Sequence, residues 1–282
     1  MILYTTVSLC ATGIASAVIL YLVARKFRVE EDPRIDRVEA LLPGANCGGC
    51  GKPGCRGFAE AIVKANTLEG LCCPVGGETT MPAIAAALGL EASARVPRVA
   101  VVRCGGDRAR RPRYSRYDGY ISCAVEHALY RGESACPFGC LGLGDCARAC
   151  AFDAIRVEES TGLPVVREEA CVACDACAKA CPRGIIELRD KGVKARRVFV
   201  NCVNRDRGAL SRAACGASCI GCGKCARDCS FGAIIVENNL AYIDFHKCRL
   251  CRKCVSSCPT GAIREENFPP RKVELSRIEF EN

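Results

Sequence analysis

Cys219-Ile-Gly-Cys222-Gly-Lys-Cys225-Ala-Arg-Asp-Cys229 and Cys248-Arg-Leu-Cys251-Arg-Lys-Cys254-Val-Ser-Ser-Cys258-Pro259 are the two stretches that decide the fold. In each of them three cysteines recur at every third position, and a fourth follows four residues later. Neighbours this close cannot easily form disulfides with one another, whereas thiolates that converge on one metal centre need such spacing. The two stretches therefore predict a pair of metal centres bound by cysteine.

The pattern C-x2-C-x2-C-x3-C-P is the bacterial ferredoxin signature, in which the fourth cysteine ligates the other cluster of a pair. Three thiolates on a tight loop cap three corners of a cubane, and the fourth corner faces the partner half. This crossover rule predicts two [4Fe–4S] sites. One is Cys219, Cys222, Cys225 and Cys258; the other is Cys229, Cys248, Cys251 and Cys254. Zinc is the weaker interpretation, because zinc ribbons use fewer such runs and neither histidine lies at a zinc-finger distance.

An upstream copy of this module carries the full signature at Cys171–Cys181, and Cys146-x3-Cys150 corresponds to Cys225-x3-Cys229. A third site is therefore expected at Cys150, Cys171, Cys174 and Cys177. The fourth site departs from the signature, because Leu143 stands where a thiol is required. We assign Cys136, Cys140, Cys146 and Cys181 to it; a three-iron centre is the alternative if one of these thiols lies too far away.

A separate cysteine cluster lies nearer the N-terminus, where Cys47-x2-Cys50-x4-Cys55 is followed by the adjacent pair Cys72 and Cys73. Only one of this pair is needed to complete four ligands. Surrounding glycines let backbone N–H groups approach the sulfur atoms closely. This stretch predicts a further [4Fe–4S] site.

The remaining cysteines leave the number of clusters open between five and six. Cys10 lies in an apolar segment, where a buried, inert thiol is expected. The other four, Cys104, Cys123, Cys202 and Cys215, either pack as buried structural thiols or converge on a sixth cluster. Their dispersed spacing matches no motif.

The N-terminal segment Ile2–Ala24 contains no charged side chain and is long enough, as a helix, to cross a bilayer. A cleaved signal peptide would need positive charges before the apolar run, but Arg25, Lys26 and Arg28 follow it. The positive-inside rule then predicts a single-pass anchor in the cytoplasmic membrane, with the bulk of the chain on the cytoplasmic side. A reducing compartment is also what so many free thiols require.

The formal net charge of +9 treats every thiol as neutral. Five clusters, each about −2 with its thiolates, would cancel this excess. A basic docking face for an acidic partner explains the charge equally well. Nucleic-acid binding is disfavoured because the basic residues are dispersed and no recognition motif accompanies them. We find no dinucleotide fingerprint, P-loop or nucleophilic triad, and so expect no catalytic residue.

The expected fold class is α+β: small metal-stabilised domains behind a single transmembrane helix. Helices are predicted at Arg56–Ala65, Pro82–Leu90 and Ile121–Tyr130, and strands at Arg98–Arg103 and Val198–Val200. Cluster ligation should supply much of the folding energy, because no apolar core of ordinary size is visible. The predicted boundaries are an anchor (1–26), an N-terminal 4Fe–4S domain (27–92), a connecting segment (93–134), ferredoxin-like module 1 (135–190), a linker (191–214), module 2 (215–268) and a tail (269–282).

These features together resemble the B subunit of the Rnf family, the membrane-bound ion-translocating ferredoxin:NAD oxidoreductases. The resemblance rests on the apolar N-terminus, on Leu42-Pro-Gly-Ala-Asn-Cys47-Gly-Gly-Cys50-Gly-Lys-Pro-Gly-Cys55, on Cys73-Pro-Val-Gly-Gly77 and on the modules. It covers essentially the whole chain and is closest to the longer form with two double-cluster modules. The family's C-P-x-G-G closure implies Cys73 as the fourth ligand.

The resemblance implies that the subunit takes electrons from soluble reduced ferredoxin and hands them to other subunits of a membrane complex, where electron flow is coupled to ion translocation. The chain would then be part of a translocase without a substrate site of its own. An iron–sulfur sensor, or the sensor-reducing role of the related Rsx complex, is the alternative. A sensor normally needs one labile cluster, and a purely structural scaffold would not need so many redox-active ligand sets.

Overall fold

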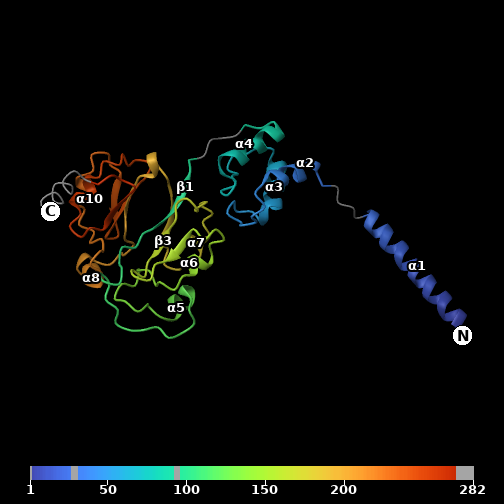
Figure 1. Cartoon of the computed structure of the whole chain (residues 1–282), viewed down its shortest axis with the longest axis horizontal. Coiled ribbons are helices and arrows are strands. Elements are labelled where there is room, and N and C mark those ends of the chain that lie inside the picture. The colour runs from blue at the N-terminus through green and yellow to red at the C-terminus, as the bar shows by residue number, and fades with distance from the viewer. Residues whose placement is uncertain (1, 27–30, 92–95, 271–282) are drawn as a thin grey trace, which may run out of the picture.

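A computed structural model describes residues 2–26, 31–91 and 96–270 of the chain. Along the sequence an isolated helix is followed by a small helical domain and then by a larger α+β body (Figure 1). The α+β body consists of two similar halves, which we call module 1 and module 2. This arrangement confirms the expected fold class.

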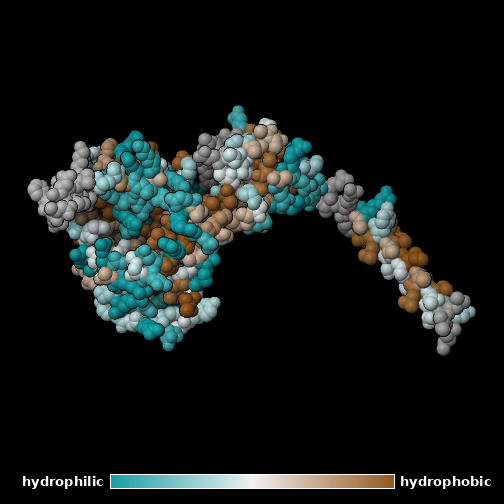
Figure 2. Space-filling model, viewed as in Figure 1, coloured by the Kyte–Doolittle hydropathy of each residue, from teal (hydrophilic) through white to brown (hydrophobic). Residues whose placement is uncertain are grey.

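The first helix, α1 (Ile2–Lys26), is apolar from end to end until Arg25 and Lys26 in its last turn. It is the one helix among the described residues that is long and apolar enough to cross a membrane, and none of it packs against the rest of the chain. Apolar residues run along most of its visible length (Figure 2). Exposed apolar side chains on all sides of a helix are typical of a segment that lies in lipid.

The helical domain consists of α2 (Pro33–Leu41), α3 (Gly54–Ala65) and α4 (Gly77–Leu88). Phe58 and Ile62 of α3 pack with Val38 of α2 and Ile84 of α4, and all four are at most 1% exposed. The helix expected at Arg56–Ala65 is confirmed. The helix expected from Pro82 begins earlier, because a preceding turn is closed by the Thr80 N–H, which bonds to the Gly76 carbonyl at 3.4 Å.

Each module combines two short antiparallel two-stranded sheets with two one-turn helices. One sheet is a local hairpin. The other pairs a strand that precedes the module's cysteine runs with a strand that follows them. The elements of module 1 are β1 (Arg98–Val102), α6 (Asp145–Arg148), β2 (Ile155–Val157), β3 (Pro164–Val166), α7 (Ala176–Lys179) and β4 (Ile186–Asp190). Those of module 2 are β5 (Arg197–Val200), α9 (Lys224–Arg227), β6 (Ile234–Glu237), β7 (Leu240–Ile243), α10 (Lys253–Ser257) and β8 (Ile263–Glu266).

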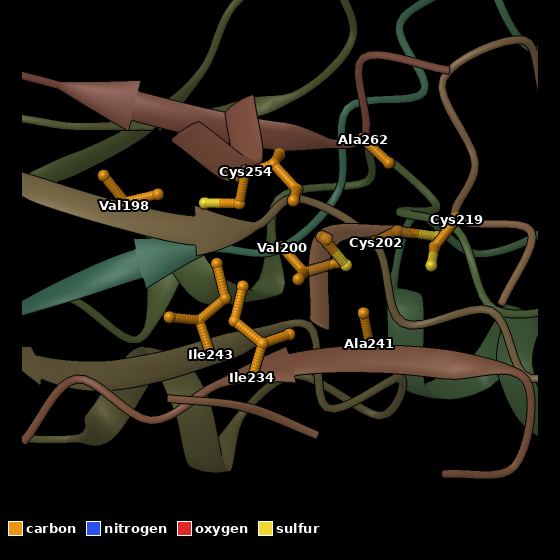
Figure 3. Close-up of a cluster of buried hydrophobic side chains, with 11 residues drawn as sticks. Val198, Val200, Cys202, Cys219, Ile234, Ala241, Ile243, Cys254 and Ala262 are labelled. Carbon is orange, nitrogen blue, oxygen red and sulfur yellow. The ribbon is translucent and has the colours of Figure 1, made fainter. Parts of the chain in front are cut away.

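The strands predicted near residues 98 and 198 are β1 and β5, so both are confirmed. The helix predicted around residues 121–130 is α5 (Cys123–Leu129). Two short elements, η1 (Val193–Ala195) and α8 (Gly208–Ala214), lie in the segment between β4 and α9. Cysteines and aliphatic side chains share each module's core. In module 2, Cys254 and Cys219 lie on opposite sides of Val200 within one buried cluster (Figure 3).

Two buried arginines of module 1 pack on aromatic rings of module 2. Arg189 of β4 is 1% exposed, and its guanidinium carbon lies 5.2 Å from the ring centre of Tyr242, 5.5 Å from that of Phe245 and 5.7 Å from that of Phe199. Arg103, directly after β1, also stacks on Tyr242, at 5.0 Å from the ring centre. Cation–π contacts of this kind hold the modules together.

Candidate metal centres

The N-terminal centre is built on the loops before α3 and α4. The first loop is fixed by Asn46, whose side-chain oxygen accepts a 2.8 Å hydrogen bond from the Cys55 N–H. Cys73 is buried beside Cys50 and Cys55 in the core of the helical domain. Burial raises the pKa of the Cys73 thiol, and the nearby charges of Cys55 and Cys47 raise it further. Cys50, Cys55 and Cys73 therefore share this core, and Cys47 is close enough for its charge to act on Cys73, while Cys72 is not part of the core.

Module 2 contains two cavities of about 350 and 340 Å³. The first is lined by the expected Cys219, Cys222, Cys225 and Cys258, and the second by the expected Cys229, Cys248, Cys251 and Cys254. The helix α9 carries Cys225 and ends just before Cys229, so this one turn contributes to both cavities. That is the crossover arrangement of a two-cluster ferredoxin.

Module 1 also contains two cavities, of about 350 and 360 Å³. One is lined by the expected set, Cys150, Cys171, Cys174 and Cys177. The other is lined by Cys140, Cys146 and Cys181, as expected, but its fourth thiol is Cys123 instead of Cys136. The structure thus groups Cys123, and not Cys136, with these three thiols.

Cys123 reaches this cavity because Asp145 holds the start of α5. The Asp145 carboxylate accepts hydrogen bonds from the Cys123 N–H (3.0 Å), the Ala124 N–H (3.0 Å) and the Ser122 hydroxyl (2.9 Å). Burial alone would raise the pKa of Asp145, but these hydrogen bonds and the neighbouring Arg148 hold it below its ordinary value. An acidic side chain from another segment thus serves as the N-cap of α5.

Cys136 lies in a different cavity, which it shares with Cys104, Cys202 and Cys215. No local spacing motif could have revealed either this set or the role of Cys123. The four cysteines of this cavity come from four separate segments of the chain, and only the packing of the two modules brings these segments together. The one available signal was the number of cysteines, because the cysteines left outside the predicted sites are enough for one further set of four.

The thiols and their surroundings suit iron–sulfur clusters better than single metal ions. No three His, Cys, Asp or Glu side chains in the described part of the chain come close enough to share one ion. Backbone N–H groups point at sulfur, as from Ala154 to Cys150 and from Ala262 to Cys258, both at 3.3 Å. Burial raises the pKa of Cys177 and Cys254 to about 12, so ligation must displace tightly held protons.

The N-terminal centre adjoins module 1. A Cβ atom built on Gly49 would lie 2.9 Å from the Cβ of Cys174 and 2.9 Å from a ring carbon of Pro74. The negative charge of a Cys47 thiolate also raises the pKa of Cys174, after burial, which is the main cause. Only glycine at position 49 permits so close an approach.

Fold and sites define a multi-centre iron–sulfur protein of the ferredoxin type with an N-terminal apolar helix. Three family models match it: Fe-S cluster (residues 42–74), 4Fe-4S binding domain (164–187) and 4Fe-4S dicluster domain (218–263). The chain therefore binds [4Fe–4S] clusters.

Curated relatives identify the family. The chain is 43% identical, over 84% of its length and 70% of the relative, to the B subunit of the Na(+)-translocating ferredoxin:NAD(+) oxidoreductase complex of Acetobacterium woodii. It is 39% identical to the B subunit of the ion-translocating oxidoreductase complex of Methanosarcina acetivorans, over 85% of this chain and 89% of the relative. A Clostridium ljungdahlii protein, the B subunit of a proton-translocating ferredoxin:NAD(+) oxidoreductase complex, is 38% identical over 84% and 82%. The chain belongs to the B-subunit family of ion-translocating oxidoreductase complexes.

Proposed function

We propose that this chain is the electron-transfer subunit of a membrane complex that couples electron flow from reduced ferredoxin to NAD with ion translocation. A [4Fe–4S] cluster accepts and releases one electron, which is the chemistry that it would supply at each site. The relatives named as ferredoxin:NAD(+) oxidoreductase subunits support the reaction. The observation that carries the proposal is the placement of the thiol sets in series.

The series begins near the apolar helix. The N-terminal set adjoins the Cys174 set through Gly49. Within module 1 the helix α6 carries Cys146 of one set and ends just before Cys150 of the next, and α9 does the same in module 2. Sites that share one helical turn are neighbours, so each module keeps its two centres close together. We assign the ligands as the cavities group them, with Cys73 completing the N-terminal set.

One end of the series is open to solvent. Cys251 is exposed, and the exposed residues Lys247, Arg249 and Lys253 flank it in the sequence. Buried centres do not meet a soluble partner directly, whereas an exposed centre with a positive rim suits a negatively charged carrier. We therefore place the docking site of an acidic, ferredoxin-like donor at this end.

The other end faces the membrane. Arg25 and Lys26 close the apolar helix α1, and positive residues at this position favour a cytoplasmic location for the chain beyond them. We infer that α1 anchors the chain in the cytoplasmic membrane, that the modules lie on the cytoplasmic side, and that the remaining subunits of the complex receive the electrons.

Single substitutions test the proposal in membranes that contain the whole complex. Cys251→Ala and Cys174→Ala should each abolish ferredoxin-driven NAD reduction, while Cys10→Ala and Cys72→Ala, matched removals of thiols outside the sets, should leave it unchanged. Full activity of Cys251→Ala or Cys174→Ala would remove those sites from the electron path.

Charge reversal tests the docking site separately. The triple variant Lys247→Glu, Arg249→Glu, Lys253→Glu should lower kcat/KM for ferredoxin about tenfold or more at low salt, since a charged rim raises on-rates by that order. Lys64→Glu, an exposed position on α3, is the control. Equal effects of the two variants, or an effect independent of salt, would refute the assignment.

A further inference from the structure

A cavity of about 300 Å³ lies where module 1, module 2 and the segments that precede them meet. Four cysteines line it, and each is at most 8% exposed: Cys104, Cys136, Cys202 and Cys215. Four cysteines also line each of the four ferredoxin-like cavities. We propose that these four thiolates bind a sixth [4Fe–4S] cluster, which connects the two modules.

Hydrogen-bond donors approach three of these sulfur atoms. The Cys140 N–H points at the Cys104 sulfur at 3.4 Å, and the Asn204 N–H points at the Cys202 sulfur at 3.4 Å. The buried side-chain amide of Asn204 lies 3.6 Å from the Cys136 sulfur. N–H groups aimed at sulfur stabilise thiolates that ligate iron, and the same pattern is present at Cys150 and Cys258 of the ferredoxin-like sites.

The charge of the lining fits an anionic group. Arg103 and Arg111 both line the cavity, and both are at most 9% exposed. A cluster with four thiolates carries about −2 overall, so the two guanidinium groups would offset its charge. Arg103 is also paired with Glu187 at 3.1 Å, so Arg111 is the cation whose burial beside four neutral thiols would be costly.

Glycines keep the cavity wall thin. A Cβ atom on Gly106 would lie 2.9 Å from the Cys215 sulfur, and one on Gly139 would collide with the Arg111 guanidinium. Any larger residue at these positions would displace a sulfur atom or a balancing charge. The wall is therefore shaped around the positions that the sulfur atoms occupy.

Two other uses of four buried thiols fit less well. Disulfides are absent among the described cysteines, all of which are free. A single zinc ion would need the four sulfur atoms packed around one point, and no such grouping occurs among the residues that the structure describes. A cubane holds its four thiolates further apart, at the corners of a larger body.

The position of the site links the modules. Cys140 belongs to a module 1 site and donates its N–H to Cys104 of this one. Cys202 lies beside Cys219 of a module 2 site (Figure 3), and both belong to one buried cluster. The cavity thus adjoins one ferredoxin-like site of each module and fills the gap in the series on which the proposed function rests.

Metal analysis of the anaerobically purified full chain is the first test. About 24 irons and about 24 sulfides per chain, with six clusters in the native mass spectrum, would support the proposal. About 20 irons would overturn it, and so would about 20 irons with one zinc per chain. This readout is independent of activity, so it can fail while the proposed electron-transfer function stands.

Pairs of substitutions test the ligand sets. Removal of two ligands of the same cluster should abolish one cluster, whereas removal of one ligand from each of two clusters should abolish both. Cys136→Ala with Cys104→Ala should lose about four irons, whereas Cys136→Ala with Cys140→Ala should lose about eight. If Cys136 shared a cluster with Cys140, as the sequence alone indicated, Cys136→Ala with Cys140→Ala would lose only about four irons, and this result would refute the ligand set. Cys72→Ala should lose none. A variant that keeps its remaining irons is folded. If a double variant does not fold, the iron content of the wild-type chain still tests the proposal.

Discussion

Asp145 is the residue on which the unexpected ligand Cys123 depends, and its removal makes a quantitative prediction. Its carboxylate is the N-cap of α5, and its side chain is 15% exposed. Asp145→Ala removes the three hydrogen bonds that the carboxylate accepts from the start of α5, and the ion pair with Arg148. The first residue of α5 is then free to leave the cavity that it shares with Cys140, Cys146 and Cys181.

The expected cost follows from which donors water can reach. Ala124 is exposed, so water can replace the lost acceptor there. Cys123 is buried, and an unpartnered buried N–H costs about 1–3 kcal/mol. The usual cost of losing a helix cap, about 1 kcal/mol, already contains this loss and falls within the same range. Local opening of α5 should therefore become easier by about 1–3 kcal/mol, which is roughly a 5- to 150-fold faster amide exchange.

Hydrogen–deuterium exchange of the peptide that spans residues 121–130 measures this change, with iron content measured in parallel. Asp118→Ala, an exposed aspartate on the preceding loop, is the matched control, and Asp145→Asn should fall between the two. Exchange and iron content equal to those of Asp118→Ala would refute the idea that Asp145 positions Cys123.

Three further perturbations have defined outcomes. Phe58→Ala empties the centre of the helical domain at a cost of about 3–5 kcal/mol, so about four irons should be lost there while the modules keep theirs. Arg189→Ala removes a buried cation from three aromatic rings and should lower the free energy of unfolding in urea by about 2–4 kcal/mol, with Arg189→Met less affected. Burial raises the pKa of Glu168, but hydrogen bonds from Arg197 and Asn267 outweigh it and hold that pKa below its ordinary value. Because Glu168 is 24% exposed and therefore partly screened, Glu168→Gln should cost only about 1 kcal/mol at neutral pH, a gap that should close as the pH falls from about 5 through the folded-state pKa of Glu168.

The parts of the sites that the sequence predicts are those whose ligands lie on one tight loop. Cys248, Cys251 and Cys254 are separated by two residues each, so local geometry alone sets their convergence. The crossover to Cys229 was also predictable, because Cys229 follows Cys225 by the same spacing as Cys150 follows Cys146 in module 1. Strands β1 and β5 were also predictable, since short apolar runs such as Arg98–Val102 favour a strand whatever its partner.

The ligand groupings and strand pairings that the sequence does not predict depend on long-range packing. The choice between Cys123 and Cys136 is decided by an aspartate more than twenty positions beyond Cys123, which caps a helix from outside its own segment. Likewise the partners of β1 and β5 are β4 and β8, which lie on the far side of each module's cysteine runs. Spacing rules cannot reach across such separations, because each residue between them adds conformational freedom.

The buried arginines at the contact between the modules have a consequence for how the protein matures. The terminal nitrogens of Arg189 have no hydrogen-bond partner within the described part of the chain, and its charge lies close enough to Cys248 to lower that thiol's pKa against the effect of burial. In an unloaded chain Glu187 is the carboxylate paired with Arg189, and it is shared with Arg103, so two buried cations face one anion. Insertion of iron and sulfide supplies further negative charge beside them. Closure of the two modules and insertion of their inorganic cores should therefore favour each other, so that newly made chains pass from an open, metal-free form to a closed, filled one with few stable forms between.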